Sequence, residues 1–257
     1  MANVQPHRIH FSASDVSIAQ KAKTALAGLY GQVEMEKADV IVALGGDGFM
    51  LHMLHSTEDI DVPVYGMNCG TVGFLMNEYG EKDLPARLAA AEETVINPLA
   101  MRAQKADGSV HEALAINEVS LLRAGPQAAK LRISVDGRVR MKELICDGAL
   151  LATPAGSTAY NYSAHGPILP IGSEVLALTA MSAFRPRRWR GALLPKSAVV
   201  RFDVNEPDKR PVMADADSRS VRDVVSVEIR SADHIRHRIL FDPGHGLEER
   251  LIREQFV

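Results

Sequence analysis

The sequence has little of several features that mark specialised classes of protein. It contains two cysteines, Cys69 and Cys146, far apart in the chain, so neither a disulfide framework nor a cysteine-ligated zinc site is expected. No apolar run reaches about eighteen residues, and the N-terminal residues lack a charged segment followed by an apolar one. The formal net charge of −3 gives no general attraction to nucleic acid or to an anionic membrane. We therefore expect a cytoplasmic protein with no nucleic-acid or membrane partner.

The composition nevertheless supports a large folded core. Hydrophobic residues make up 46% of the 257 residues and charged residues 24%, as in an ordinary globular protein. This length allows one large domain or two smaller ones. No internal repeat or low-complexity segment is present in the sequence.

The N-terminal part of the chain alternates strand-like and helix-like patterns. Strands are expected at 8–11, 40–44 and 62–67, and helices at 17–30, 49–55 and 83–91. Strands that alternate with helices form a parallel sheet with helices on both faces. We therefore predict an α/β domain with an open parallel sheet over residues 1–97.

The pattern changes after Asn97 and Pro98. Hairpin signals follow at Asp107–Gly108, at Asp136–Gly137 and around Pro207. Strands at 131–135 and 199–204 alternate apolar and polar residues, as half-buried strands do. These features predict a mainly β, sandwich-like domain over residues 98–240.

The last segment, residues 241–257, returns to a helical pattern after Pro243 and Gly244. Its apolar residues, Leu247, Leu251, Ile252 and Phe256, recur at helical spacing. We expect a C-terminal helix that packs back on the first domain.

One acid among three glycines follows the buried strand expected at 40–44. Gly45, Gly46, Asp47 and Gly48 would lie at the carboxyl edge of the sheet, where open α/β sheets bind ligands. Glycines there allow positive φ and let phosphate oxygens approach backbone N–H groups. A carboxylate would repel phosphate, so a functional Asp47 would face a hydroxyl, and the two together describe a kinase. The turn is neither a dinucleotide fingerprint nor a P-loop, and it is equally typical of a tight turn with Asp47 as N-cap.

Two further clusters carry polar residues in apolar surroundings. The pair Asn117–Glu118 lies inside a strand-like run, where unsatisfied polar groups are expensive to bury, so partners or a ligand are expected. Residues 144–169 place Asp147 at one end of a predicted strand and small hydroxyl side chains in the turn beyond it. Such a polar loop could bind the edges of adenine and ribose.

These clusters, in this order, resemble the NAD kinase family. The resemblance rests on GGDG at 45–48, NCGTVGFL at 68–75, the pair Asn117–Glu118, and the run from Asp147 to Leu169. It implies transfer of the γ-phosphoryl group of ATP, or of inorganic polyphosphate, to the 2′-hydroxyl of the adenosine ribose of NAD, which gives NADP. It also implies a homodimer or homotetramer, and Mg²⁺ or another divalent cation brought with ATP rather than held by a protein metal site.

The resemblance assigns roles to individual residues. Asp47 would be the general base, Asn117 would contact adenine, and Glu118 would contact a ribose. The other residues expected to bind substrate are Gly45, Gly46, Gly48, His52, Phe74, Asp147, Ser157, Thr158, Ala159, Tyr160, Asn161, Ser163 and Asp217.

The chain departs from the family pattern at three places. Asp215, Ala216 and Asp217 stand where most members carry Asp-Gly-Gln, which puts a polar contact from the third position in doubt. Phe49 follows the glycine turn where a small or polar residue is common, and Ala155 stands where threonine is frequent.

Two other functions share part of this pattern. A lipid or sphingoid kinase has the same glycine turn, but it calls for an apolar channel or membrane-facing surface, and no strongly amphipathic membrane helix is evident. A non-catalytic dinucleotide-sensing module would keep the pocket and lose the chemistry. His52 and His55 are spaced to share a helix face, but no third metal ligand is in view, so no metal site is predicted.

Overall fold

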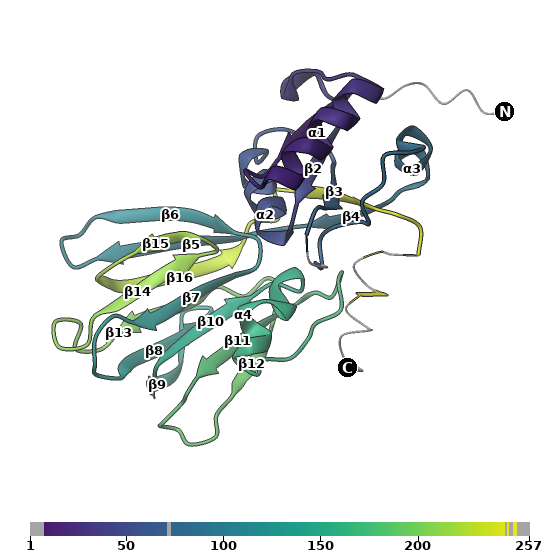
Figure 1. Ribbon diagram of the computed structural model, residues 1–257. Coiled ribbons are helices and arrows are strands. Elements are labelled where there is room, and N and C mark those ends of the chain that lie inside the picture. The colour runs from purple at the N-terminus through teal and green to yellow at the C-terminus, as the bar shows by residue number, and fades with distance from the viewer. Residues whose placement is uncertain (1–7, 71–72, 245, 247–248, 251–257) are drawn as a thin grey trace. The chain divides into compact units, whose positions relative to one another are not determined.

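The computed structural model describes residues 8–70, 73–244, 246 and 249–250. The chain divides into two compact units. The first comprises Met1–Ile96 with Ile235–Val257, and the second comprises Asn97–His234. The elements of both units are labelled in Figure 1.

A five-stranded sheet forms the first unit. Its strands lie in the order β1 (Ile9–Ala13), β2 (Val40–Gly45), β3 (Val64–Asn68), β17 (His237–Phe241) and β4 (Glu92–Ile96). The first four strands run parallel to their neighbours, and β4 pairs antiparallel with β17. The sheet is therefore mixed, with an antiparallel edge strand that the sequence pattern did not predict.

Helices cover both faces of this sheet, as expected. The helical elements are α1 (Ser17–Tyr30), the short 3₁₀ helix η1 (Met35–Lys37), α2 (Asp47–Ser56) and α3 (Leu84–Ala90). Leu26 of α1 and Leu84 of α3 share a core cluster with Phe11 and Val42. Met50 of α2 lies on the opposite face, where its sulfur is 3.3 Å from the position that a Cβ on Gly66 would occupy.

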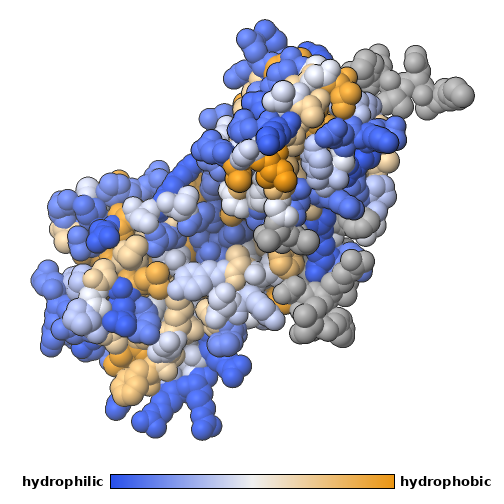
Figure 2. All heavy atoms as spheres, viewed as in Figure 1, coloured by the Kyte–Doolittle hydropathy of each residue, from blue (hydrophilic) through white to orange (hydrophobic). Residues whose placement is uncertain are grey.

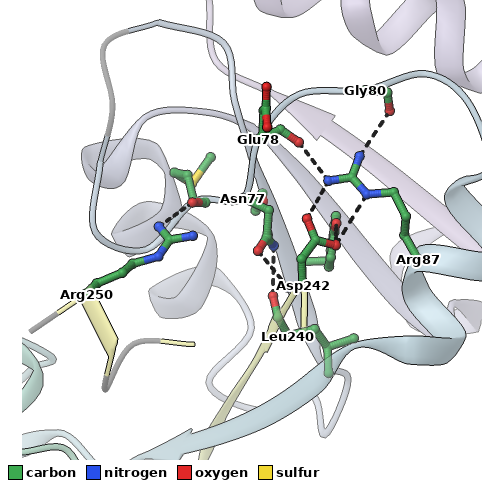
Figure 3. A network of polar contacts seen from close by, with 10 residues as sticks. Asn77, Glu78, Gly80, Arg87, Leu240, Asp242 and Arg250 are labelled. Carbon is green, nitrogen blue, oxygen red and sulfur yellow. Dashed lines mark hydrogen bonds and ion pairs between the residues drawn. The ribbon is translucent and has the colours of Figure 1, made fainter. Parts of the chain in front are cut away.

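β17 is fixed in the sheet by an ion pair directly after it. The carboxylate of Asp242 accepts a hydrogen bond from the Tyr65 hydroxyl of β3 at 2.6 Å. It also accepts one from the Arg87 guanidinium of α3 at 2.6 Å (Figure 3). Burial and this carboxylate raise the pKa of the Tyr65 hydroxyl. The units divide at Ile235 rather than at residue 241, because β17 pairs with β3 and β4.

Two six-stranded antiparallel sheets form the second unit. One has the order β12-β11-β10-β7-β14-β15, and the other has the order β6-β5-β16-β13-β8-β9. The strands are β5 (Leu99–Lys105), β6 (Val110–Ala115), β7 (Glu118–Arg123), β8 (Ala129–Val135), β9 (Arg138–Cys146), β10 (Gly148–Ala152), β11 (Val175–Met181), β12 (Gly191–Pro195), β13 (Val200–Val204), β14 (Val212–Ala216), β15 (Arg219–Val221) and β16 (Val224–Ser231). Two short helices, η2 (Ala155–Thr158) and α4 (Tyr160–Ser163), follow β10.

The second unit is the sandwich that the sequence predicted. Leu121 and Leu151 from one sheet and Ile133 and Phe202 from the other belong to one buried cluster. Asp136 and Gly137 form the predicted hairpin turn, both with positive φ. The segment around Pro207 is not a hairpin, because β13 and β14 belong to different sheets and this segment connects them.

Among the described residues, no helix is long and apolar enough to cross a membrane. On the face seen in Figure 2, hydrophilic residues cover most of the area, and hydrophobic residues lie between them in small groups. The C-terminal helix expected from Leu247, Leu251, Ile252 and Phe256 falls outside the described residues.

Candidate functional site

Asp47 is the first residue of α2, directly after β2. Its carboxylate accepts two backbone N–H groups from the segment after β3, from Phe74 at 2.7 Å and from Leu75 at 2.9 Å. The N-cap of α2 is Gly46, and no side chain caps the helix. Asp47 is thus not an N-cap, because its side chain links the glycine turn to another loop.

The carboxylate of Asp47 can accept a further hydrogen bond. Two carboxylate oxygens offer about four lone-pair sites, and the two loop amides occupy two of them. Asp47 is half-buried rather than enclosed. The geometry therefore holds the carboxylate still and leaves it able to accept a hydrogen bond from a hydroxyl.

Gly73 makes this contact possible, and sequence reasoning gave it no role of its own. A Cβ on Gly73 would lie 2.3 Å from Oδ1 of Asp47, which no side chain tolerates. The glycine lies within the run NCGTVGFL that the sequence analysis singled out. Only the fold shows that it faces Asp47.

The three glycines around Asp47 matter because they lack a side chain, and not because they adopt unusual dihedral angles. None has a positive φ, and Gly46 has a φ of −124°. The turn therefore does not use the positive φ that glycine would allow. A Cβ on Gly46 or on Gly48 would have no described atom outside its neighbours within 4 Å. The backbone at these two positions is open to an approaching group.

Phe49, the aromatic residue that departs from the family pattern, packs on Gly45. A Cβ on Gly45 would lie 2.8 Å from Cβ of Phe49, so the aromatic side chain packs over the glycine. The ring of Phe49 lies 6.2 Å from the ring of His52, which is exposed on α2. Phe49 therefore fills the space beside the turn, and this packing requires glycine at position 45.

The segment after β3 is anchored at its far end by a buried amide. Nδ2 of Asn77 donates to the carbonyl of Gly66 at 3.1 Å. It also donates to the carbonyl of Leu240 at 3.0 Å, and Oδ1 accepts the N–H of Asp242 at 2.9 Å (Figure 3). Asn77 is 1% exposed. The loop that holds Asp47 thus ends at a point that is fixed to the sheet.

In the second unit, three separate segments meet at the start of β7. Asp217, in the turn after β14, accepts the backbone N–H of Ile116 at 2.7 Å and of Asn117 at 3.0 Å. Thr153, just after β10, donates its backbone N–H to the carbonyl of Asn117 at 2.9 Å. The backbone of Asn117 is thereby fixed, while its side chain makes no hydrogen bond to the described residues.

Glu118 is an acid of this cluster whose environment disfavours its charge. Its Oε2 atom is buried and has no hydrogen-bond partner among the described residues. Burial, and then the charge of Asp217, raises the pKa of Glu118 to about 8, while the N–H of Tyr160 acts against the shift. A buried carboxylate oxygen that lacks a hydrogen-bond partner is typical of a ligand site.

The hydroxyl-rich turn divides into a buried part and an exposed part. Ser157 and Asn161 are both 0% exposed. Oγ of Ser157 accepts the N–H of Leu169 at 3.0 Å, and Asn161 donates to the carbonyls of Ser157 and Pro167 and accepts from Thr179. These two side chains hold the turn together rather than face solvent.

The other side chains of the turn are accessible. Thr158 and Ala159 are half-buried, whereas Tyr160 and Ser163 are exposed. The pKa of the Tyr160 hydroxyl is raised by burial first, and then by the carboxylates of Glu118, Asp147 and Asp215. Tyr160 therefore lies among acidic groups that come from three different segments.

Asp147 is separated from the turn by the whole of β10. The five residues of β10 span about 16 Å, and the carboxylate of Asp147 pairs with Arg123 at 2.6 Å. Asp147 thus lies at the other end of β10 from Asn117–Glu118, and its charge still acts on the Tyr160 hydroxyl.

No group of three or more His, Cys, Asp or Glu residues within the described part of the chain could hold a metal ion. His55, one of the two histidines with metal-like spacing, has Nδ1 2.7 Å from the carboxylate of Glu58.

Comparison with known proteins identifies the family. Models of the ATP-NAD kinase N-terminal and C-terminal domains match residues 1–93 and 116–231. An NAD kinase of Cereibacter sphaeroides is 71% identical over 252 residues, with 98% of this chain and 99% of the relative covered. An NAD kinase of Caulobacter vibrioides is 62% identical over 249 residues, with 97% and 96% covered.

Two solved structures share the fold. Yeast NADH kinase complexed with NADH gives a TM-score of 0.83 at 21% identity, over 98% of this chain and 88% of that one. An NAD kinase from Archaeoglobus fulgidus in complex with ATP gives a TM-score of 0.75 at 24% identity, over 97% of each chain. With both family models matched and relatives aligned over nearly the whole length, the chain belongs to the ATP-NAD kinase family.

Proposed function

We propose that the protein is an NAD kinase in which Asp47 is the general base. The carboxylate would accept the proton of the 2′-hydroxyl of the adenosine ribose of NAD. The 2′-oxygen forms a bond to the γ-phosphorus of ATP while the bond between that phosphorus and the bridging oxygen of ADP breaks. The products are NADP and ADP.

The proposal rests mainly on the carboxylate of Asp47, which is held in place next to backbone that no side chain of the described residues covers. Two loop amides hold Asp47, and Gly46 and Gly48 leave the neighbouring backbone uncovered. Phosphoryl transfer depends mainly on positioning and charge neutralisation, for which a fixed acceptor and accessible N–H groups are suited. The named NAD kinases at 71% identity support the same reaction.

The residues of the second unit would bind the adenosine part of NAD. The buried Oε2 of Glu118 would gain a hydrogen bond from a ribose hydroxyl, and the side-chain amide of Asn117 would contact adenine. Thr158, Ala159, Tyr160 and Ser163, which are half-buried or exposed, would also contact the nucleotide. Ser157, Asn161 and Asp217 would instead hold the backbone of the site in place.

A divalent cation would arrive with ATP. Since the described residues offer no cluster of metal ligands, the ion would be held by phosphate oxygens, where it neutralises negative charge. Homo-oligomeric assembly and a cytoplasmic location belong to the same proposal, and the assembly is checked by measuring the mass of the protein in solution.

The first experiment is an assay of the purified protein with ATP, Mg²⁺ and NAD, in which NADP is detected through a coupled dehydrogenase. Polyphosphate replaces ATP in a second arm, and a lipid diol replaces NAD in a third. NADP formation is expected. Absence of NADP with every donor would overturn the proposal, and phosphorylation of the lipid or binding of NAD without transfer would identify the alternative function.

The second experiment replaces Asp47. Asp47→Asn should abolish turnover, because an amide cannot accept the proton, while NAD affinity stays within about tenfold, or about 1.4 kcal/mol. Asparagine keeps one acceptor oxygen for the loop amides, so thermal unfolding is measured alongside. Asp15→Asn, an exposed acid of the same unit, is the matched control. Substantial phosphoryl transfer by Asp47→Asn would contradict the role of base.

A further inference from the structure

The loop that holds Asp47 has a second partner on its other side. Nη1 of Arg250 donates to the carbonyl oxygens of Gly73 at 3.0 Å and Phe74 at 3.1 Å, and also to that of Met76. Figure 3 shows the guanidinium of Arg250 directed at a backbone carbonyl of this loop. Arg250 is therefore the counterpart of Asp47 across the loop.

Two consecutive peptide groups connect these side chains. In the first, the carbonyl of Gly73 accepts from Arg250 and the N–H of Phe74 donates to Asp47. In the second, the carbonyl of Phe74 accepts from Arg250 and the N–H of Leu75 donates to Asp47. The N–H and C=O of a peptide group point in opposite directions, so each group is held from both ends.

This arrangement strengthens the bonds to Asp47. A cation at the carbonyl oxygen polarises the peptide group and makes its N–H a better donor, as in other hydrogen-bond chains. The guanidinium itself is fixed, since its Cζ lies 5.4 Å from the centre of the ring of Phe241, which is 0% exposed. A positive charge at a fixed point thus orients two amides toward one carboxylate.

We infer that Arg250 is a positioning residue for Asp47, acting through the peptide groups between Gly73 and Leu75. The inference rests on the proposed function, in which Asp47 takes a proton during phosphoryl transfer. Without Arg250 the loop keeps its anchor at Asn77 but loses the contacts that aim its amides. A carboxylate that is no longer held in one orientation is a poorer acceptor for the hydroxyl proton.

The test compares Arg250→Ala with Arg238→Ala, which removes an arginine of β17 that pairs with Glu93 at 2.7 Å in the same unit. Arg250→Ala should lower kcat roughly ten- to a hundredfold with KM for NAD nearly unchanged, the pattern of lost positioning. Added guanidinium ion should restore part of kcat in Arg250→Ala and none in Asp47→Asn.

Arg238→Ala, the control variant, should keep kcat within about twofold. Arg250→Lys should fall between wild type and Arg250→Ala, because an ammonium cannot reproduce the planar donor set.

A second readout does not depend on activity. Hydrogen exchange at the amides of Phe74 and Leu75 should accelerate at least about tenfold in Arg250→Ala and remain unchanged in Arg238→Ala. Unchanged exchange, or a kcat per folded molecule equal to that of the wild type, would overturn the inference. Absence of NADP formation by the wild type would instead overturn the proposed function, and the exchange experiment would still decide the role of Arg250.

Discussion

At the scale of single residues, Glu118 stands out because its environment disfavours its charge. The buried Oε2 atom lacks a partner among the described residues, and the neighbouring carboxylate of Asp217 is held 2.7 Å from the N–H of Ile116. Two acids close together in a poorly solvated place cannot both ionise easily. Keeping Glu118 ionised therefore costs free energy in the free protein, and under the proposed function a ribose hydroxyl would relieve this cost on binding.

This cost predicts a pH dependence of stability. The pKa of Glu118 is raised to about 8 in the folded protein, against the ordinary glutamate value of 4.5 in the unfolded chain. Between these values the folded protein keeps a proton that the unfolded chain releases, so the free energy of unfolding falls as pH rises and levels off above pH 8. Glu118→Gln carries no charge and should lose this slope.

Urea unfolding of wild type and Glu118→Gln at about pH 5.5 and about pH 8.5 measures the effect. The difference in stability between the two proteins should move in favour of Glu118→Gln at the higher pH. Glu112→Gln, an exposed acid of the same unit, serves as control. Parallel pH profiles for wild type and Glu118→Gln would contradict the assignment of a raised pKa.

At the scale of elements, the turn after β10 is packed directly on the backbone before β7. A Cβ on Gly156 would lie 2.1 Å from the carbonyl oxygen of Asn117 and 2.4 Å from its Cα. Backbone atoms cannot rotate away as the end of a side chain can. The close approach of the two segments therefore depends on glycine at this position.

Gly156→Ala should separate the two segments. We expect a loss of about 1–3 kcal/mol in stability from the forced backbone shift, together with at least a tenfold rise in KM for NAD. The contrasting variant is Gly28→Ala in α1, where a Cβ meets no described atom within 4 Å and alanine should stabilise the helix by about 0.5–1 kcal/mol. Thermal unfolding and steady-state kinetics measure both. Wild-type values for Gly156→Ala would show that the turn does not need the close contact.

At the scale of the whole molecule, the order of strands differs from the order of the sequence. β17 comes from the last part of the chain, yet it lies between β3 and β4 of the first unit. The family models match residues 1–93 and 116–231 and so do not include it. The first unit is therefore completed only after the second unit has been synthesised.

A chain that ends at His234 should fail to form the first unit, although it keeps every residue matched by the family models. Loss of β17 uncovers two strand edges and removes the buried residues Ile239 and Phe241. Far-ultraviolet circular dichroism should show loss of helix, and limited proteolysis should cut within residues 8–96. A chain that ends at Gly244 keeps β17 and Asp242 and should retain the sheet. Equal protease resistance of both truncated chains would contradict this prediction.

Local signals in the sequence were sufficient for several elements. The spacing of apolar residues predicted a helix at 17–30, where α1 begins and ends, and Asp136–Gly137 predicted its hairpin. Each of these depends on residues close together in the chain, whose dihedral preferences and periodicity are local properties. The antiparallel strand β4 was missed because Glu92–Ile96 pairs with β17, more than a hundred residues away.

The sequence by itself determined the family, the two kinds of unit and the motifs that contain Asp47, Asn117 and Glu118. Each of these depends on short stretches of neighbouring residues. Tertiary structure alone decided what those residues touch. Asp47 meets Phe74 across 27 positions, and Arg250 meets Gly73 across 177. Ser157 and Asn161, which the motif assigns to substrate, are buried inside the turn. Contacts of this length follow from sheet order and packing, which no local pattern contains.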